Sequence, residues 1–243
     1  MQTPLKNLKT KTNAISTLKE LIPTGTVIGT YPFYDGNVEF RLAETDRFVI
    51  GNTQSRAVAE FWHCVMKDSN KISLMAGKLY PMLNESTFDI LRKQWYTYTD
   101  PFVRSGLFFL LNRCSSLGMV SHGEFGSDNF DLLSVRDLKN FRVKNFSIKL
   151  IEEYSQNEAE INLFMAGKYY FDVLDITEPR GVEESSFRHT ETLKKFKKTP
   201  TIFVYEYHPR LPNIKGYSKI LLDQYGRKTT EQNAKEIILH NVR

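Results

Sequence analysis

The sequence predicts an α/β fold with a parallel sheet, on the basis of three observations. Helix-like and strand-like segments alternate from residue 14 to about residue 66, and strand-like runs return after residue 145. Between them lies a stretch of helices separated by polar turns. Strands that alternate with amphipathic helices are typical of parallel strands joined by crossover helices. The middle stretch has the pattern of an inserted helical lobe.

The first part of the chain contains two predicted helices and two predicted strands. Residues 14–21 form a short helix, and residues 26–31 form a β-rich run with the length of a buried strand. A second strand covers residues 47–50. Thr53 or Ser55 then caps a helix whose apolar residues repeat at helical spacing.

The later elements continue the same alternation. Within the lobe, the apolar run from Val103 to Leu111 is the segment most clearly expected to be buried. Three further strands are expected at 145–150, 169–174 and 201–205. A basic helix is expected at 188–198, and a C-terminal hairpin pairs 218–222 with 234–240.

Composition narrows the class of protein. The 243 residues suffice for one α/β domain, or one domain with a lobe, and the net charge of +5 favours polyanions only if it is concentrated on one face. The only two cysteines, Cys64 and Cys114, are far apart in the sequence, so we expect two buried thiols in a reducing compartment. The five histidines are scattered, so no metal site is expected.

No apolar window is long enough to span a membrane and no secretory segment is seen, which predicts a cytoplasmic or virion-associated protein that is not secreted.

Short motifs in the lobe resemble those of a known family. The motifs are Leu110-Leu111-Asn112-Arg113-Cys114, Leu117-Gly118 and Gly123-Glu124-Phe125. They are similar to the Leu-Asn-Arg, Gly-Leu and Gly-x-Phe series of the Dam-type DNA adenine N6-methyltransferases. Four further segments match the same family in the same order, at 18–23, 31–40, 49–52 and 235–241. The resemblance therefore covers nearly the whole chain.

This resemblance implies a Rossmann-like S-adenosylmethionine methyltransferase fold with an inserted helical lobe that recognises DNA. The methyltransferase-like domain would comprise residues 1–66 and 146–243. The lobe would comprise residues 67–145, with a DNA-reading hairpin near residues 117–130. S-adenosylmethionine would lie at the carboxyl edge of the sheet.

The cofactor motifs depart from the family pattern. Phe33 and Gly36 stand in the family's Glu-Pro-Phe-x-Gly-Gly-Gly turn, but only one of its three glycines is present, with Asp35 and Asn37 on either side of it. Glycine lets the backbone approach a cofactor closely, so the two side chains are expected to impair that contact. Asn52 replaces the carboxylate that would bind the ribose. The N-terminal segment that ends at Lys11 lacks the family's tryptophan and glycine.

The catalytic motif departs further. The family's Asp-Pro-Pro-Tyr tetrad should follow the strand at 169–174, but the chain reads Asp175-Ile176-Thr177-Glu178. Asp175 could keep one vestigial role, whereas the aromatic residue that stacks on a flipped base is missing. Loss of a base stack and of two hydrogen bonds to charged groups would together cost about 3–9 kcal/mol. The resemblance thus implies lost catalysis, with Lys11, Phe33, Gly36 and Asn52 as a vestigial cofactor site.

Four residues are candidates for contacts with nucleic acid. Asn112 and Arg113 match the family's lobe motif, and Lys194 and Lys195 lie in a basic helix that could follow phosphates. Each could also have no role in binding, because an arginine at a helix end often pairs with a nearby carboxylate and a run of lysines is usually a solvent-exposed face.

Three hypotheses on function stay open. The leading one is a catalytically degenerate methyltransferase homologue that acts as a DNA-binding or structural subunit of a larger assembly and needs no cofactor. The second is a divergent but active DNA adenine methyltransferase that uses S-adenosylmethionine. The third is a protein-interaction scaffold without nucleic acid. DNA is the expected partner of the first two and a protein partner is expected of the third, with no membrane in any of them.

Overall fold

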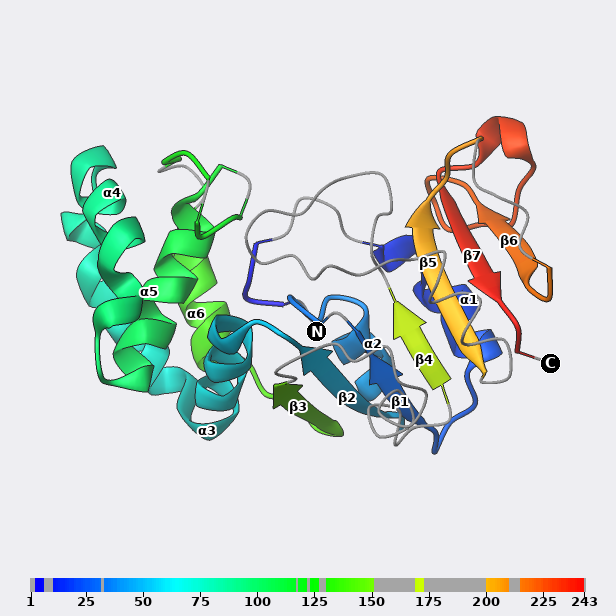
Figure 1. Cartoon of the computed structure of the whole chain (residues 1–243), viewed down its shortest axis with the longest axis horizontal. Helices are drawn as coiled ribbons and strands as arrows, with labels where there is room; N and C mark the ends of the chain where they lie inside the picture. Colours follow the sequence, from blue (N-terminus) through cyan, green and yellow to red (C-terminus); the bar gives the residue numbers. More distant parts are fainter. Residues whose placement is uncertain are drawn as a thin grey trace.

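A computed structural model gives the fold, and its described residues are 3–6, 11–31, 33–116, 118–121, 123–126, 130–150, 169–172, 200–209 and 215–242. The backbone alone is described for 169–172. Within these residues the chain forms one seven-stranded sheet beside a group of helices (Figure 1). The predicted α/β class is confirmed.

The described strands are joined in the order β3-β2-β1-β4-β5-β7-β6. The five strands from β3 to β5 are parallel, and β7 runs antiparallel to both β5 and β6. The predicted hairpin of the C-terminal region is confirmed by the pairing of β6 with β7. The bounds of the strands are Val27–Thr30 for β1, Phe48–Thr53 for β2, Phe146–Leu150 for β3, Tyr169–Asp172 for β4, Thr201–Glu206 for β5, Ser218–Leu222 for β6 and Glu236–His240 for β7.

The strand order reverses between β1 and β4. From β1 the chain continues to β2 and β3 on one side, whereas β4 and β5 extend the sheet on the other side. In open α/β sheets, ligands bind outside the carboxyl ends of the strands at such a reversal. The ends of β1 and β2 are therefore the first place to look for a site.

Two short helices cover one face of the sheet. They are α1 (Ile15–Leu21), preceded by the 3-10 turn η1 (Thr12–Ala14), and α2 (Glu39–Ala43). Apolar residues of both helices pack against alternate residues of the strands, such as Ile28 and Val49. This period-2 alternation is what a half-covered strand requires.

Arg47 fastens the carboxyl end of α1 to the sheet. Its Nε donates to the carbonyl of Ile22 at 2.9 Å, and its two terminal nitrogens donate to the carbonyls of Lys19 and Thr45, each at 2.9 Å. The last carbonyls of a helix have no partner inside the helix, so a buried arginine that binds them stabilises the helix end.

The lobe consists of four helices and two 3-10 turns in the described residues. They are α3 (Arg56–Leu79), η2 (Tyr80–Met82), α4 (Glu85–Gln94), η3 (Trp95–Thr97), α5 (Pro101–Cys114) and α6 (Leu132–Asn140). Side-chain oxygens of Ser55, Asn84, Asp100 and Asp131 accept hydrogen bonds from the first free N–H groups of α3, α4, α5 and α6. Ser55, one of the two predicted caps, is thus the cap of α3.

Helix α3 belongs to both parts of the molecule. It starts beside the sheet and continues into the lobe, with a kink at Asp68 where the backbone has φ −160° and ψ 85°. The side chain of Asp68 accepts a hydrogen bond from the N–H of Lys71 at 3.0 Å and so caps the second half of the helix. The kink lies next to the predicted start of the lobe at residue 67, and β3 begins at Phe146, where the lobe was predicted to end.

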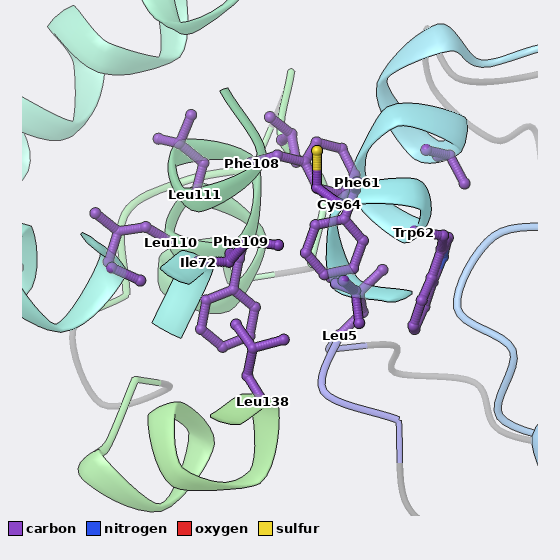
Figure 2. Packing of buried hydrophobic residues seen from close by; sticks show 14 of the residues in the cluster. Leu5, Phe61, Trp62, Cys64, Ile72, Phe108, Phe109, Leu110, Leu111 and Leu138 are labelled. Carbon is purple, nitrogen blue, oxygen red and sulfur yellow. The ribbon is translucent and has the colours of Figure 1, made fainter. Parts of the chain in front are cut away.

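An aromatic core joins the lobe to the sheet. The ring of Trp62 on α3 lies 4.8 Å from the ring of Phe40 and 5.5 Å from that of Phe141. On the lobe side of the same helix, Phe61 packs on Phe108 at 5.4 Å. Figure 2 shows this cluster, which includes most of the predicted apolar run of α5. The prediction that this run is buried is confirmed.

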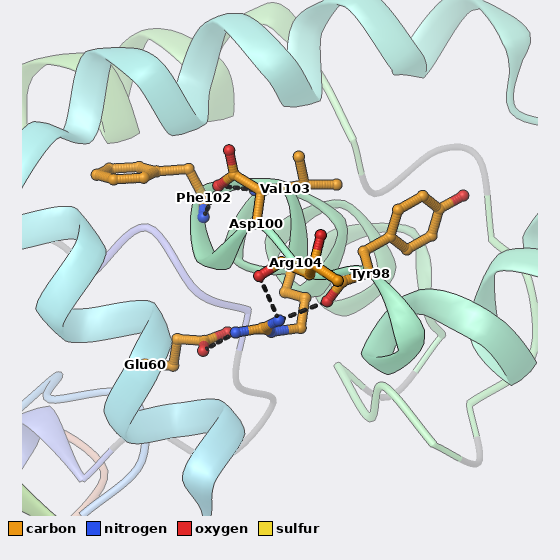
Figure 3. A network of polar contacts seen from close by, with 7 residues as sticks. Glu60, Tyr98, Asp100, Phe102, Val103 and Arg104 are labelled. Atoms are coloured by element: carbon orange, nitrogen blue, oxygen red, sulfur yellow. Dashed lines mark hydrogen bonds and ion pairs between the residues drawn. The ribbon is translucent and has the colours of Figure 1, made fainter.

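An ion pair links α3 to α5 at the solvent-facing side of this core (Figure 3). The Nε of Arg104 donates to the carboxylate of Glu60 at 2.7 Å, and a second guanidinium nitrogen binds the other carboxylate oxygen. Arg104 also donates to the carbonyls of Tyr98 and Thr99, just before the start of α5. The bidentate geometry fixes the crossing of the two helices.

Three expectations from composition can be compared with the structure. Both cysteines are free and buried, as predicted. No helix in the described part of the chain has the length and apolar character needed to cross a membrane. Among those same residues, no three histidine, cysteine, aspartate or glutamate side chains group as metal ligands would.

Candidate functional site at the carboxyl edge of the sheet

The candidate site is the turn that follows β1, residues 31–38, together with the end of β2. The N–H of Phe33 donates to the carbonyl of Asn52 at 2.8 Å, which ties the turn to β2. The structure thus brings together three of the predicted cofactor residues, Phe33, Gly36 and Asn52. Their arrangement decides whether a ligand could approach this edge.

Phe33 is a core residue. Its ring lies over Gly51 of β2, so closely that a Cβ atom on this glycine would be 2.7 Å from the Cγ of Phe33. The ring also packs edge-on against Phe40 and Trp62, with 5.9 Å between ring centroids in both pairs. With 1% of its surface exposed, Phe33 is packed inside the protein at this edge.

Gly36 is required by the packing of the turn. Its φ of +69° lies in the left-handed region, and a Cβ atom there would be 2.3 Å from the ring of Phe40. The backbone therefore approaches a side chain of its own protein, which is a role that glycine alone can fill. The N–H of Asn37 donates to the side chain of Asp35 at 3.2 Å, so the residues on both sides of Gly36 are buried in a local hydrogen-bonded turn.

Asn52 bridges the ends of two strands. Its Nδ2 donates to the carbonyls of Thr30 and Ile50, both at 3.2 Å, and 1% of its surface is exposed. Its Oδ1 is buried and has no hydrogen-bond partner among the described residues. The same holds for the Oδ1 of Asn37. The edge thus presents buried acceptor atoms next to a filled aromatic space.

Glu39, the first residue of α2, completes the cluster. Its Oε1 accepts a hydrogen bond from the hydroxyl of Thr30 at 3.1 Å, whereas its Oε2 is buried without a partner in the described part of the chain. Burial of this carboxyl, followed by the nearby negative charge of Asp35, raises its pKa to about 7. The sequence did not point to Glu39, because a single glutamate at the start of a short helix forms no motif.

Lys11 lies at the other end of the same edge. It precedes η1, is almost fully buried, and lies close enough to Glu236 at the start of β7 to lower the pKa of that carboxyl. Burial is the larger influence on Glu236 and raises its pKa to about 7. Since β7 is separated from β1 by two strands, Lys11 serves a different part of the edge from Phe33 and Asn52.

Asn112 is fully buried, and its side chain makes hydrogen bonds to other segments of the protein. Its Nδ2 donates to the carbonyl of Gly118 at 2.6 Å and to the hydroxyl of Tyr34 at 3.2 Å. It also binds the backbone of Lys6 through both of its side-chain atoms. A side chain in this position holds segments of its own chain together and has no exposed surface for a base or a phosphate.

Arg113, its neighbour, is half-buried at the end of α5. Its Nε is buried and has no hydrogen-bond partner among the described residues. Burial lowers the pKa of the guanidinium, and the negative charge of Asp131 offsets part of that effect. The ammonium of Lys6 lies nearby, and its pKa is lowered by its own burial and then by Arg113. Two cations therefore lie beside the turn that connects α5 to α6.

That turn is closed at its base by backbone pairing. The N–H of Ser116 donates to the carbonyl of Glu124 at 2.8 Å, and the N–H of Gly126 donates to the carbonyl of Cys114 at 2.7 Å. The only antiparallel bridge in the described part of this turn joins Ser115 to Phe125. The predicted DNA-reading hairpin at 117–130 is thus a looped turn in its described part, with pairing confined to the base.

The remaining predicted residues, Asp175, Lys194 and Lys195, lie outside the described residues. Comparison with known proteins adds no assignment. No protein-family model matches the chain, and no curated protein matches it either.

Proposed function

We propose that this chain is a methyltransferase-fold protein that has lost catalysis and acts as a DNA-binding subunit. The observation that carries the proposal is the packing of the turn after β1, where the chain's own aromatic rings bury Phe33 and crowd Gly36, two residues that the resemblance assigns to the cofactor. Such packing is what a degenerate member of the Dam-type family would tolerate.

The order of the strands supports a methyltransferase-like fold. It follows the doubly wound order 3-2-1-4-5-6 with β7 inserted antiparallel between β5 and β6. The order is compatible with a Rossmann-like sheet. The helical lobe lies in the chain between β2 and β3, as the resemblance implies.

The filled edge supports loss of the cofactor. The ring of Phe40 lies in the space over Gly36, the one glycine of the cofactor turn that the chain keeps. Asparagine at position 52 uses its amide to bind neighbouring carbonyls and offers a neutral oxygen instead of a carboxylate. A ribose diol is held more strongly by a charged acceptor than by a neutral one.

The lobe supports contact with a polyanion. The partly exposed side chain of Arg113 lies near the ammonium of Lys6, and the two positive charges would attract a phosphate. Such contacts release counterions, so the logarithm of the binding constant falls linearly with the logarithm of the salt concentration, with a slope of about 0.9 per phosphate. The salt dependence therefore reports directly on this residue.

The test is fluorescence anisotropy of a labelled duplex DNA at several salt concentrations. We expect binding that weakens steeply with salt, and we expect Arg113→Gln to lower the slope by about one phosphate contact. Arg227→Gln, which removes an exposed arginine from the turn after β6, is the matched control and should leave the slope unchanged. Absence of any DNA binding at low salt would overturn the proposal and favour the protein scaffold.

One observation favours the active enzyme as a second candidate. The three buried acceptors without partners in the described part of the chain, on Asn37, Glu39 and Asn52, could receive hydrogen bonds from a donor-rich ligand such as S-adenosylmethionine. Isothermal titration with this compound separates the two candidates. Saturable binding followed by transfer of labelled methyl to duplex DNA would establish the enzyme, and its loss in Asp175→Ala would place the reaction there.

A further inference from the structure

The segment Thr3–Lys6 lies between the sheet and the lobe and belongs to no helix or strand (Figure 1). Three of its four residues are buried. Side chains and carbonyls of other elements hold it, without the ladder of backbone bonds that would make it part of the sheet. It is therefore held in the manner of a bound peptide.

Asn112 grips the backbone of this segment. Its Oδ1 accepts a hydrogen bond from the N–H of Lys6 at 2.7 Å, and its Nδ2 donates to the carbonyl of the same residue at 3.2 Å. One amide side chain thus pairs with both polar groups of a single peptide residue, as a neighbouring β-strand would. Gly118 completes the fit, because a Cβ atom there would be 2.5 Å from the carbonyl oxygen of Lys6.

Side chains of the segment fit separate subsites. Leu5 is buried in the aromatic core that contains Phe61 and Trp62, and Figure 2 shows it directed into that cluster. The ammonium of Lys6 donates to the carbonyls of Ser115 and Ser116 at 2.8 and 2.9 Å, directly after the carboxyl end of α5. The partial negative charge at a helix carboxyl end favours a cation in this place.

The remaining contact fixes the direction of the segment. The hydroxyl of Thr3 donates to the carbonyl of Asp35 in the turn after β1, at 2.5 Å. Three contacts would therefore recognise a peptide in this groove: the apolar subsite of Leu5, the hydrogen bonds of Asn112 to the peptide backbone, and the carbonyls that bind the ammonium of Lys6.

We propose that this groove is a peptide-binding site, which the chain fills with its own residues 3–6 and which accepts in their place a segment of a partner protein that has a leucine followed by a lysine. The occupant seen in the groove fixes this chemistry. The proposal is independent of DNA binding, since it concerns an interaction with protein.

Competition with the attached segment sets the design of the test. A segment joined by a short tether has an effective concentration in the millimolar range, so a free peptide competes poorly with it. Leu5→Ser weakens the attached segment by about 10- to 100-fold, because the burial of one leucine side chain is lost. The residues that contact the segment keep their identity in this variant.

The experiment titrates full-length Leu5→Ser protein with a blocked synthetic peptide of residues 2–7 and follows tryptophan fluorescence, since Trp62 lines the leucine subsite. We expect saturable binding, at least 10-fold tighter than to wild-type protein or to the control Leu133→Ser, in which an exposed leucine of α6 is replaced. A peptide with glutamate in place of lysine should bind at least 10-fold more weakly. Adding Asn112→Ala to the Leu5→Ser protein should abolish binding.

Two results would overturn the proposal. One is no saturation of the Leu5→Ser protein at about 10 mM peptide, well above the effective concentration of the tethered segment. The other comes from hydrogen exchange in the wild-type protein and does not depend on a variant that folds. If the Lys6 amide exchanges as slowly as the amides of β5, the segment never leaves its groove before the whole protein unfolds, and no partner could replace it.

Discussion

Replacing Glu39 by glutamine removes a buried carboxyl whose pKa is raised from 4.5 to about 7. The folded protein holds the proton of this group more tightly than the unfolded chain does. Stability from this group is therefore fully present below about pH 4.5 and is lost as the pH rises through about 7. The difference of about 2.5 between the two pKa values corresponds to about 3 kcal/mol, since one pKa unit equals about 1.4 kcal/mol.

Glutamine stays neutral at every pH and can still accept the hydrogen bond from Thr30. The free energy of unfolding, measured by urea denaturation from pH 4.5 to pH 8, should therefore fall by about 3 kcal/mol less in Glu39→Gln than in the wild-type protein. The variant should be the more stable protein at pH 8. Subtracting the two curves removes the contribution of Glu236 in β7, whose pKa is also raised to about 7.

Glu44→Gln is the matched control, because it makes the same change of charge at an exposed position at the end of the same helix. If the Glu39→Gln and wild-type curves run parallel across this pH range, the carboxyl is not buried as described.

Three further predictions concern stability. Arg47→Ala removes the hydrogen bonds that hold the carboxyl end of α1, and urea denaturation should show a loss of about 2–4 kcal/mol. Gly36→Ala should cost at least about 2 kcal/mol more than Gly25→Ala in the same assay, because both glycines have φ +69° but a ring lies in the path of the new methyl group only at Gly36; equal losses would contradict the packing argument. A double-mutant cycle with Glu60→Gln and Arg104→Gln should give a coupling of about 1 kcal/mol or less, since about a quarter of each side chain is exposed, and it should shrink as salt is added.

Most of the secondary structure could be predicted from residue patterns. The strands β1, β2, β3 and β5 and the hairpin of β6 with β7 coincide with the predicted runs within a few residues. Each has a run of β-branched and aromatic residues bounded by polar turns, and this local signal does not depend on the rest of the fold.

The candidate site was harder to predict, because its character depends on packing between distant segments. The motif at Phe33 and Gly36 correctly marked the turn after β1, but the sequence does not reveal that the ring of Phe40 fills it. Likewise, the motif that contains Asn112 drew attention to the right residue with an expected contact to DNA. In the structure this amide makes hydrogen bonds to the backbone of Lys6, 106 positions earlier in the chain. No local sequence pattern encodes a contact over that separation.

The passage of α3 from the sheet into the lobe has a consequence for protein engineering. Its aromatic side chains serve both halves at once, so a fragment cut at the kink would expose rings from the middle of a single apolar interior. Neither fragment should be soluble alone, and a chimera that grafts the helical lobe onto another sheet would have to transplant the whole helix together with Phe40 and Phe146. The two halves should also melt in one cooperative transition.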